Sequence, residues 1–212
     1  MNQYPIIARE GWLFIAISLL AVFLSYFYNI TSLSLFFGIL LLFKIQFFRD
    51  PIRKINSKAN EVVSAADGRV ISVEEADDPY NKRRAIKISV FMNVFNVHSN
   101  KAPISGQIIN KVYMPGKFIN ADFDKASKEN EQCAITIQNS RKQLVTSVQI
   151  AGLIARRILC YVGEGQKINV GDRYGFIRFG SRVDHYIPLK SKIKVKLGQK
   201  VKNTSTILAL LP

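Results

Sequence analysis

The sequence has few of the residues that build metal centres. Its 212 residues include only two histidines and two cysteines, and the cysteines, Cys133 and Cys160, form no Cys-x-x-Cys pair. Structural metal sites use clusters of these residue types, so we expect no His-rich or Cys-rich metal centre. We interpret the two cysteines as reduced, buried structural thiols.

Acidic residues are also scarce relative to basic ones. The chain has 15 Asp and Glu against 30 Lys and Arg, which gives a formal net charge of +15. Such a surplus favours polyanionic partners, either nucleic acid or an anionic lipid surface. The sequence has no zinc-finger spacing and no interleaved aromatic and basic RNA-binding signature. We therefore expect anionic membrane lipid as a partner and no nucleic acid.

One long stretch lacks charge altogether. Residues 11–43 contain no charged side chain and are rich in Leu, Ile and Phe. A membrane-spanning helix needs about 20 apolar residues, whereas the apolar core of a cleaved signal peptide has only about 7–15. We therefore predict a permanent N-terminal α-helical membrane anchor. Two short helices that turn at Asn29 and one long tilted helix both fit this stretch.

Basic residues gather after the apolar stretch. Five Lys and Arg residues lie between positions 44 and 58, against Arg9 alone before the stretch. The positive-inside rule places the domain that follows on the cytoplasmic side of the membrane. Each basic residue near an anionic surface adds about 1 kcal/mol of attraction. We expect an anchor with a basic linker over residues 1–58 and a second domain over residues 59–212.

The second domain has the pattern of a mainly β fold. Short β-branched runs are separated by Gly and Asp-Gly, which are typical of turns. The runs lie at residues 62–63, 69–73, 85–90 and 106–112. We expect residues 78–84 to form an exposed charged connection and residues 118–131 to form a polar loop.

A short repeat near the end indicates how these strands are arranged. Gly-Gln-Lys-Ile at residues 165–168 matches Gly-Gln-Lys-Val at 198–201, and residues 102–108 have a similar pattern. These units resemble the half-motifs of biotinyl and lipoyl domains, without the lysine-bearing turn that carries the cofactor. They predict a barrel-like β sandwich, although ordinary hairpins would also fit.

Three residues could support nucleophilic chemistry. A serine such as Ser181 needs a base, and the base needs a group that orients it. His185 lies four residues further along an expected strand, about 13 Å from Ser181 and too far to act as that base. His98 lies where an apolar run meets a polar turn. Asp67 precedes a glycine, and Asp-Gly is more often a simple turn.

Five segments in order resemble a known family. They are residues 47–51, 64–70, 93–103, 152–157 and 171–184. They are similar to the short, membrane-anchored bacterial (type A) branch of the phosphatidylserine decarboxylase proenzymes. By this resemblance, Asp67, His98 and Ser181 correspond to the family's catalytic Asp-His-Ser set, and Gly180 with Ser181 to its cleavage site. Ala65 departs from the pattern, since the family often has Pro there, and the cut reads Phe-Gly-Ser-Arg where many members have Leu-Gly-Ser-Thr.

The resemblance implies a self-processing enzyme. Ser181 would attack the Gly180 carbonyl, which divides the chain into a β chain (1–180) and an α chain (181–212). The two chains would form a heterodimer, with a higher oligomer left open. Ser181 would become a pyruvoyl group that forms a Schiff base with phosphatidylserine and yields phosphatidylethanolamine and CO2. The resemblance implies the bacterial inner membrane as the location and requires neither pyridoxal phosphate nor a metal.

Other readings stay open. A membrane-anchored serine hydrolase would use Asp67, His98 and Ser181 without self-cleavage, although the Gly-x-Ser-x-Gly elbow of many hydrolases is missing. A non-enzymatic β scaffold on the membrane is a third possibility. Arg49 and Arg182 either pair with the lipid phosphate or carboxylate, or belong to the general basic surface.

Overall fold

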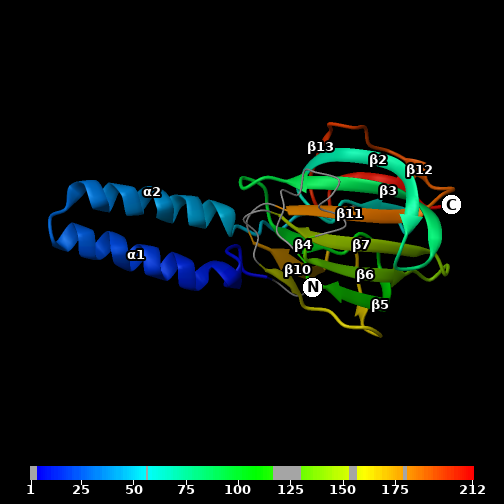
Figure 1. Ribbon diagram of the computed structural model, residues 1–212, viewed down its shortest axis with the longest axis horizontal. Coiled ribbons are helices and arrows are strands. Elements are labelled where there is room, and N and C mark those ends of the chain that lie inside the picture. The colour runs from blue at the N-terminus through cyan, green and yellow to red at the C-terminus, as the bar shows by residue number, and fades with distance from the viewer. Residues whose placement is uncertain (1–3, 56, 117–129, 153–156, 179–180) are drawn as a thin grey trace. The chain divides into compact units, whose positions relative to one another are not determined.

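The protein divides into a helical unit and a β unit. The computed structural model describes residues 4–55, 57–116, 130–152, 157–178 and 181–212 (Figure 1). The compact units are Met1–Ile52 and Arg53–Pro212, and each is described by itself. The division falls after Ile52, before the boundary at residue 58 that the sequence indicated.

The helical unit is a hairpin of two apolar helices. A short 3-10 turn, η1 (Arg9–Gly11), leads into α1 (Trp12–Phe27), and α2 (Thr31–Phe47) follows. Asn29 turns the chain with a φ of 58°, in the left-handed region that Asn tolerates better than most residues. Two helices with a turn at Asn29 is therefore the correct alternative.

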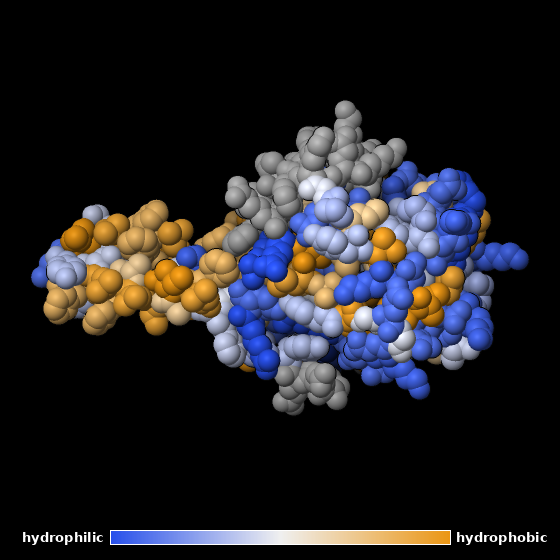
Figure 2. All heavy atoms as spheres, turned by 60° about the horizontal axis from the view of Figure 1, so that its bottom comes forward, coloured by the Kyte–Doolittle hydropathy of each residue, from blue (hydrophilic) through white to orange (hydrophobic). Residues whose placement is uncertain are grey.

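The helical unit has the length and surface of a membrane anchor. Residues Arg9–Phe27 are long and apolar enough to cross a membrane, and α2 is a shorter apolar helix. Figure 2 shows hydrophobic residues over most of the visible surface of this unit, whereas the β unit is largely hydrophilic. These features indicate membrane association.

A lysine joins the two helices. Lys44 Nζ on α2 donates to Ser18 Oγ on α1 at 2.5 Å and to the Phe14 carbonyl at 3.4 Å. An ammonium in an apolar setting needs such acceptors, because burying it without a partner is costly. Lys44 therefore cross-links the hairpin.

The β unit contains three antiparallel sheets in its described residues. The strands are β1 (Glu61–Val63), β2 (Gly68–Asp78), β3 (Arg83–Met92), β4 (Ser99–Lys101), β5 (Gly106–Met114), β6 (Gln132–Gln138), β7 (Leu144–Ala151), β8 (Ile158–Cys160), β9 (Lys167–Ile168), β10 (Arg173–Ile177), β11 (Ser181–Pro188), β12 (Lys192–Ile193), β13 (Lys200–Val201) and β14 (Ile207–Leu210). The largest sheet has eight strands in the order β13-β2-β3-β11-β7-β6-β5-β9. Two smaller sheets have the orders β1-β14-β12 and β4-β10-β8.

The large sheet curls around a continuous hydrophobic core (Figure 1). Side chains from all three sheets meet there, including Val70, Ile135, Val183, Tyr174 and Leu208. The mainly β, barrel-like fold expected from the sequence is confirmed.

The Gly-Gln-Lys repeat builds two matching turns. Gly165 and Gly198 have φ values of 81° and 80°, which glycine adopts without strain. The short strands that follow, β9 and β13, are the two outermost strands of the large sheet. The Gly165 amide donates to the Ile108 carbonyl at 2.7 Å, and the Gly198 amide donates to the Val70 carbonyl at 2.8 Å. The two turns are thus structural equivalents.

The third expected unit has a different role. Residues 102–108 do not form such a turn; Gly106 begins β5 and pairs with Ile168 of β9. Gly68 begins β2 and pairs with Val201 of β13 in the same way. The repeat therefore consists of two halves, each a Gly-Gln-Lys turn placed on a strand that begins with glycine.

Candidate active site

Ser181 begins the central strand β11 of the large sheet. It pairs with Met92 of β3 on one side and with Ala151 of β7 on the other. The residue is fully buried, and its hydroxyl donates to the Met92 sulfur at 3.3 Å. Gly180, the other residue of the expected cleavage site, lies outside the described residues.

His98 lies directly before β4 and is fully buried. Its Nδ1 is 2.9 Å from the Asn96 carbonyl, so a proton on Nδ1 would be donated to that oxygen. The His98 carbonyl accepts a hydrogen bond from the Ile177 amide at 3.2 Å. Ile177 ends β10, shortly before Ser181. The pairing of β4 with β10 therefore brings the His98 turn beside Ile177, which is four residues before Ser181.

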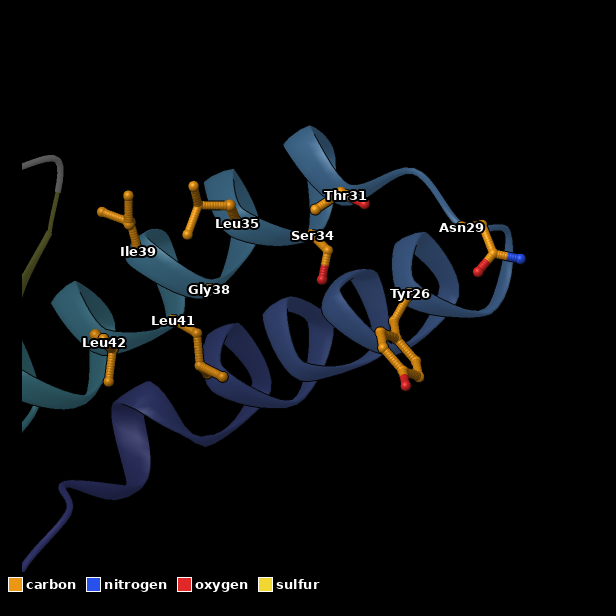
Figure 3. Close-up of a pocket in the computed structure, with 9 residues that line it drawn as sticks. All are labelled: Tyr26, Asn29, Thr31, Ser34, Leu35, Gly38, Ile39, Leu41 and Leu42. Atoms are coloured by element: carbon orange, nitrogen blue, oxygen red, sulfur yellow. The ribbon is translucent and has the colours of Figure 1, made fainter.

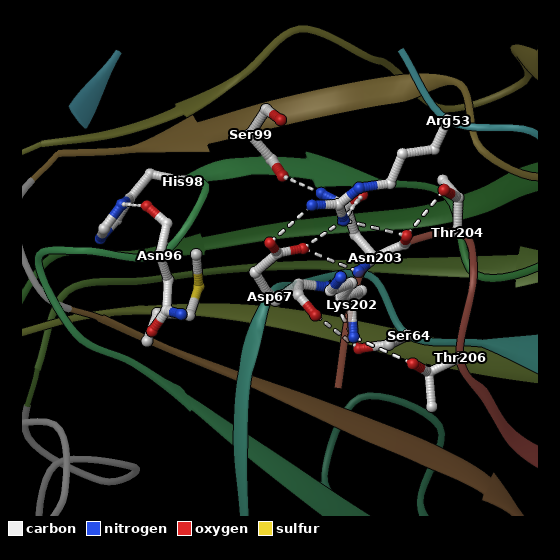
Figure 4. Close-up of polar contacts among 12 residues, drawn as sticks. Arg53, Ser64, Asp67, Asn96, His98, Ser99, Lys202, Asn203, Thr204 and Thr206 are labelled. Atoms are coloured by element: carbon white, nitrogen blue, oxygen red, sulfur yellow. Dashed lines mark hydrogen bonds and ion pairs between the residues drawn. The ribbon is translucent and has the colours of Figure 1, made fainter. Parts of the chain in front are cut away.

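Asp67 lies in the loop between β1 and β2 and is held by an arginine. Both terminal nitrogens of Arg53 donate to the carboxylate, Nη2 to Oδ2 at 2.7 Å and Nη1 to Oδ1 (Figure 4). The backbone N–H of Asn203 donates to Asp67 Oδ1 at 2.9 Å. A bidentate guanidinium–carboxylate pair is strong and fixes the orientation of both planes.

The segments of Asp67 and His98 are neighbours. The Lys101 amide of β4 donates to the Ala65 carbonyl at 3.0 Å, and Asn203 Nδ2 donates to the Ser99 carbonyl at 3.2 Å. Figure 4 shows the Asp67 carboxylate facing Arg53 and Asn203, while the His98 ring is bonded to Asn96.

Direct hydrogen bonds from Asp67 to His98 and from His98 to Ser181 stay a prediction. In the described part of the protein, the Asp67 carboxylate bonds to Arg53 and Asn203, and the Ser181 hydroxyl bonds to Met92. The fold thus brings the three expected segments together, with Asp67 and Ser181 bonded to partners other than His98.

His185 has a role that the sequence did not reveal. It lies on β11, as expected, and its Nε2 accepts a hydrogen bond from the Ala65 amide at 3.0 Å. Its Nδ1 lies 3.3 Å from the Ile88 carbonyl. Complete burial lowers the pKa of His185 to about 4. The neutral ring therefore supports the loop that carries Asp67.

Arg53 and Asn203 were also missed by sequence reasoning. Arg53 appeared only as one member of the basic cluster, and no motif included Asn203. The one available signal was the offset of 33 residues between the Gly-Gln-Lys units, which places Asn203 opposite Val170. A comparison of the two halves would have shown a polar residue replacing an apolar one.

Arg182 does not lie on the basic surface. Its side chain is completely buried, with Nε 2.5 Å from Asp184 Oδ1 and Nη2 2.8 Å from Ser89 Oγ. Successive side chains of a strand alternate between faces, so Arg182 points to the face opposite Ser181. The interpretation of Arg182 as part of the solvated basic surface is therefore wrong, and its pairing with the lipid phosphate or carboxylate stays a prediction.

The two cysteines are neighbours in the fold. Cys133 is buried, as expected, whereas Cys160 is only partly buried. A hydrogen bond from the Cys133 thiol lowers the pKa of Cys160, and the same contact raises the pKa of Cys133. The described residues contain no group of three or more His, Cys, Asp and Glu side chains placed to hold a metal ion.

The helical unit has a hollow of its own. Figure 3 shows it beside the turn of the hairpin. Its cavity volume is about 580 Å³. Its lining is Tyr26, Asn29, Thr31, Ser34, Leu35, Gly38, Ile39, Leu41 and Leu42. The lining is mainly apolar and contains no acid, base or nucleophile suited to catalysis at neutral pH.

Comparison with known proteins identifies the family. The family model described as phosphatidylserine decarboxylase matches residues 40–209. A phosphatidylserine decarboxylase proenzyme of Paraburkholderia xenovorans is 57% identical over 98% of this chain and 98% of its own. Proenzymes of the same name from Burkholderia cenocepacia (57% identical, 98% of this chain and 97% of the relative) and Burkholderia pseudomallei (56%, 99% and 97%) are similar. This chain therefore belongs to the phosphatidylserine decarboxylase family.

Proposed function

We propose that this chain is a membrane-associated proenzyme that cleaves itself between Gly180 and Ser181. The processed protein then converts phosphatidylserine to phosphatidylethanolamine and CO2. The observation that carries the proposal is the match over 98% of the chain to relatives named phosphatidylserine decarboxylase proenzyme. The burial of Ser181 at the start of a central strand supports it.

Position 181 is suited to a pyruvoyl group. The backbone there is bonded between β3 and β7, and the Met92 thioether beside the side chain is only weakly polar. A reactive ketone at this place would be shielded from bulk water. The pyruvoyl group would bind the amine of the substrate and take up the electrons released as CO2 leaves.

His98 is the proposed base of self-cleavage. It removes the proton from Ser181 Oγ, and the oxygen attacks the carbonyl carbon of Gly180. The peptide C–N bond breaks, which leaves an ester and a free amine on Ser181. Loss of the Ser181 α proton then breaks the Cβ–O bond and frees the Gly180 carboxylate. Water hydrolyses the remaining enamine, ammonia departs, and the pyruvoyl group remains.

Asp67 is the proposed orienting group for His98. Its Oδ2 accepts one hydrogen bond, from Arg53, and a carboxylate oxygen has room for a second. In this scheme the His98 ring exchanges its bond to Asn96 for one to Asp67 Oδ2. Asp67 then stabilises the imidazolium that forms when His98 takes the serine proton.

The helical unit and its flanking charge support a membrane location. We propose that the hairpin inserts in the bacterial inner membrane and that the β unit lies on the cytoplasmic side. Arg9–Phe27 has the length and composition of a span, and the basic cluster after the hairpin supports the orientation. This arrangement places the β unit at the surface where lipid headgroups lie.

Cleavage and turnover test the proposal. Purified wild-type protein on a denaturing gel should give two chains, residues 1–180 and 181–212, and the smaller chain should have a blocked amino terminus by mass spectrometry. Ser181→Ala should remain whole and should release no CO2 from phosphatidylserine vesicles, whereas the exposed control Ser205→Ala should behave as wild type. An intact wild-type chain with full activity, or cleavage of Ser181→Ala, would contradict the proposal.

A further inference from the structure

The two halves of the repeat cap an equivalent backbone N–H with different side chains. After each Gly-Gln-Lys turn, a backbone amide must be capped. In one half the Val170 amide donates to Ser105 Oγ at 2.8 Å. In the other half the backbone N–H of Asn203 donates to Asp67 Oδ1 at 2.9 Å. A serine hydroxyl is therefore sufficient for the fold at this place.

The backbone that follows confirms the equivalence. Gly171 and Thr204 both have a positive φ, 81° and 60°, and their amides donate to the carbonyls of Ala102 and Ser64 at 2.9 and 3.0 Å. The two halves thus have the same local conformation. Differences in side chain between them are therefore not required by the turn itself.

One half is more polar than the other at the equivalent positions. The Asp67 carboxylate replaces the Ser105 hydroxyl, and the side-chain amide of Asn203 replaces the apolar side chain of Val170. Arg53 donates hydrogen bonds to both Asp67 and Asn203. Arg53 Nη1 donates to Asn203 Oδ1 at 2.6 Å in addition to its two bonds to Asp67. Asn203 Nδ2 donates to the carbonyl of Ser99, the residue next to His98.

This polar network is enclosed and satisfied. The side chains of Arg53 and Asp67 are 16% and 9% exposed, and Asn203 is 2% exposed. The backbone N–H and C=O of Asn203 and both polar atoms of its side chain are hydrogen-bonded. Enclosed ion pairs add little net stability compared with apolar packing. Stability alone therefore does not account for these residues.

We propose that Arg53 and Asn203 are positioning residues for self-cleavage. Arg53 fixes the plane of the Asp67 carboxylate, and Asn203 ties that carboxylate to the strand that begins beside His98. This inference rests on the proposed function, in which Asp67 and His98 act at Ser181. Neither Arg53 nor Asn203 touches the reacting atoms.

The repeat itself supplies the variants that test this role. Asn203→Val copies Val170, and Asp67→Ser copies Ser105, so both retain contacts that already fold in the other half. Full-length chains are made by cell-free translation with lipid nanodiscs, and cleavage is followed by pulse-chase. Arg53→Ala and Asn203→Val should each slow cleavage by about 10- to 100-fold, because displacing a catalytic group by about 1 Å can cost that much in rate. Asp67→Ser removes the orienting group itself and should slow cleavage at least as much.

Two controls separate positioning from folding. Arg83→Ala removes the arginine partner of buried Asp78 and should lower stability, with unchanged cleavage in the protease-resistant, folded fraction. Val170→Asn places a side-chain amide in the half of the repeat that lacks Asp67 and Arg53, and this variant should cleave at the wild-type rate. If Arg83→Ala slows cleavage of the folded fraction as much as Arg53→Ala does, the inference is wrong.

A double variant shows whether Arg53 acts through Asp67. Because coupled residues are non-additive, Arg53→Ala with Asp67→Ser should cleave no more slowly than Asp67→Ser alone. Arg53→Lys should restore only part of the rate, since lysine lacks the bidentate fork. Wild-type rates in Arg53→Ala and Asn203→Val, or additive effects in the double variant, would overturn the inference. Cleavage of Ser181→Ala would instead overturn the proposed function.

Discussion

Arg182 and Asp184 form a completely buried ion pair within one strand. They are two residues apart on β11, so their side chains share a face of the large sheet. Nε and Nη2 of Arg182 lie 2.5 and 3.0 Å from the two carboxylate oxygens. The pair lies on the face of β11 opposite Ser181, where it supports the strand.

Breaking this pair should be costly, and replacing it should not be. Arg182→Met leaves the Asp184 carboxylate buried without its partner, and we expect a loss of about 3–5 kcal/mol in the free energy of unfolding. Arg182→Met with Asp184→Leu should recover most of that loss. Denaturant unfolding of the Ser181→Ala background would measure both. Arg84→Met, at an exposed ion pair, should cost less than about 1 kcal/mol, and an equal loss at both sites would contradict this account.

His185 should make stability depend on pH. Its pKa is about 4 in the folded protein, against 6.5 for an ordinary histidine. Between pH 6.5 and pH 4, His185 is protonated in the unfolded chain but neutral in the folded protein. The free energy of unfolding therefore decreases as the pH falls from 6.5 to 4. The difference corresponds to about 3 kcal/mol. Unfolding midpoints at pH 7 and pH 4.5 should differ much less in His185→Gln, and an unchanged pH dependence in that variant would argue against the assignment.

Gly68 should not accept a side chain. A Cβ there would lie 2.0 Å from the Phe91 carbonyl oxygen, which belongs to the backbone of the neighbouring strand. Gly68→Ala must push β2 and β3 apart, and we expect it to destabilise the protein by at least about 1–3 kcal/mol. A Cβ at Gly163 meets nothing within 4 Å, so Gly163→Ala should stay within about 0.5 kcal/mol of wild type. Thermal unfolding of the two variants makes the comparison, and equal stability would refute it.

Cys160 should react with electrophiles before Cys133 does. The Cys133 thiol donates to Cys160, and this lowers the pKa of Cys160 and favours its thiolate relative to that of Cys133. Iodoacetamide labelling followed by peptide mass spectrometry should modify Cys160 first, and at a lower pH than Cys133. In Cys133→Ala the hydrogen-bond donor to Cys160 is lost, and the pH dependence of Cys160 labelling should move to higher pH. Faster labelling of Cys133 in the wild type would disprove the assignment.

Local patterns in the sequence predicted the two kinds of structure correctly. The uncharged stretch indicated apolar helices, and the β-branched runs indicated strands, because both signals depend on neighbouring residues. The turn at Asn29 could not be chosen from the sequence, since a stretch of that length fits one helix or two. The Gly-Gln-Lys repeat showed where two turns form but not that they flank the same sheet.

Contacts between distant residues were the part that the sequence did not reveal. Residues 78–84 have the composition of an exposed connection, yet Asp78 is completely buried and accepts a hydrogen bond from Thr146 Oγ1 at 3.0 Å. The setting of Asp67 depends in the same way on Asn203, which is 136 residues away. Such pairings arise from strand order, and no local pattern encodes them.

The position of Ser181 within the large sheet has a consequence for any molecule cut before it. Residues 181–212 supply β11 inside that sheet, β13 at its edge, and β12 and β14 in a smaller sheet. The two pieces are interleaved, so dilution cannot separate them and neither piece can be exchanged with another molecule without unfolding. Each cut molecule would thus keep the pyruvoyl group that we propose at position 181, and its specific activity should not depend on protein concentration.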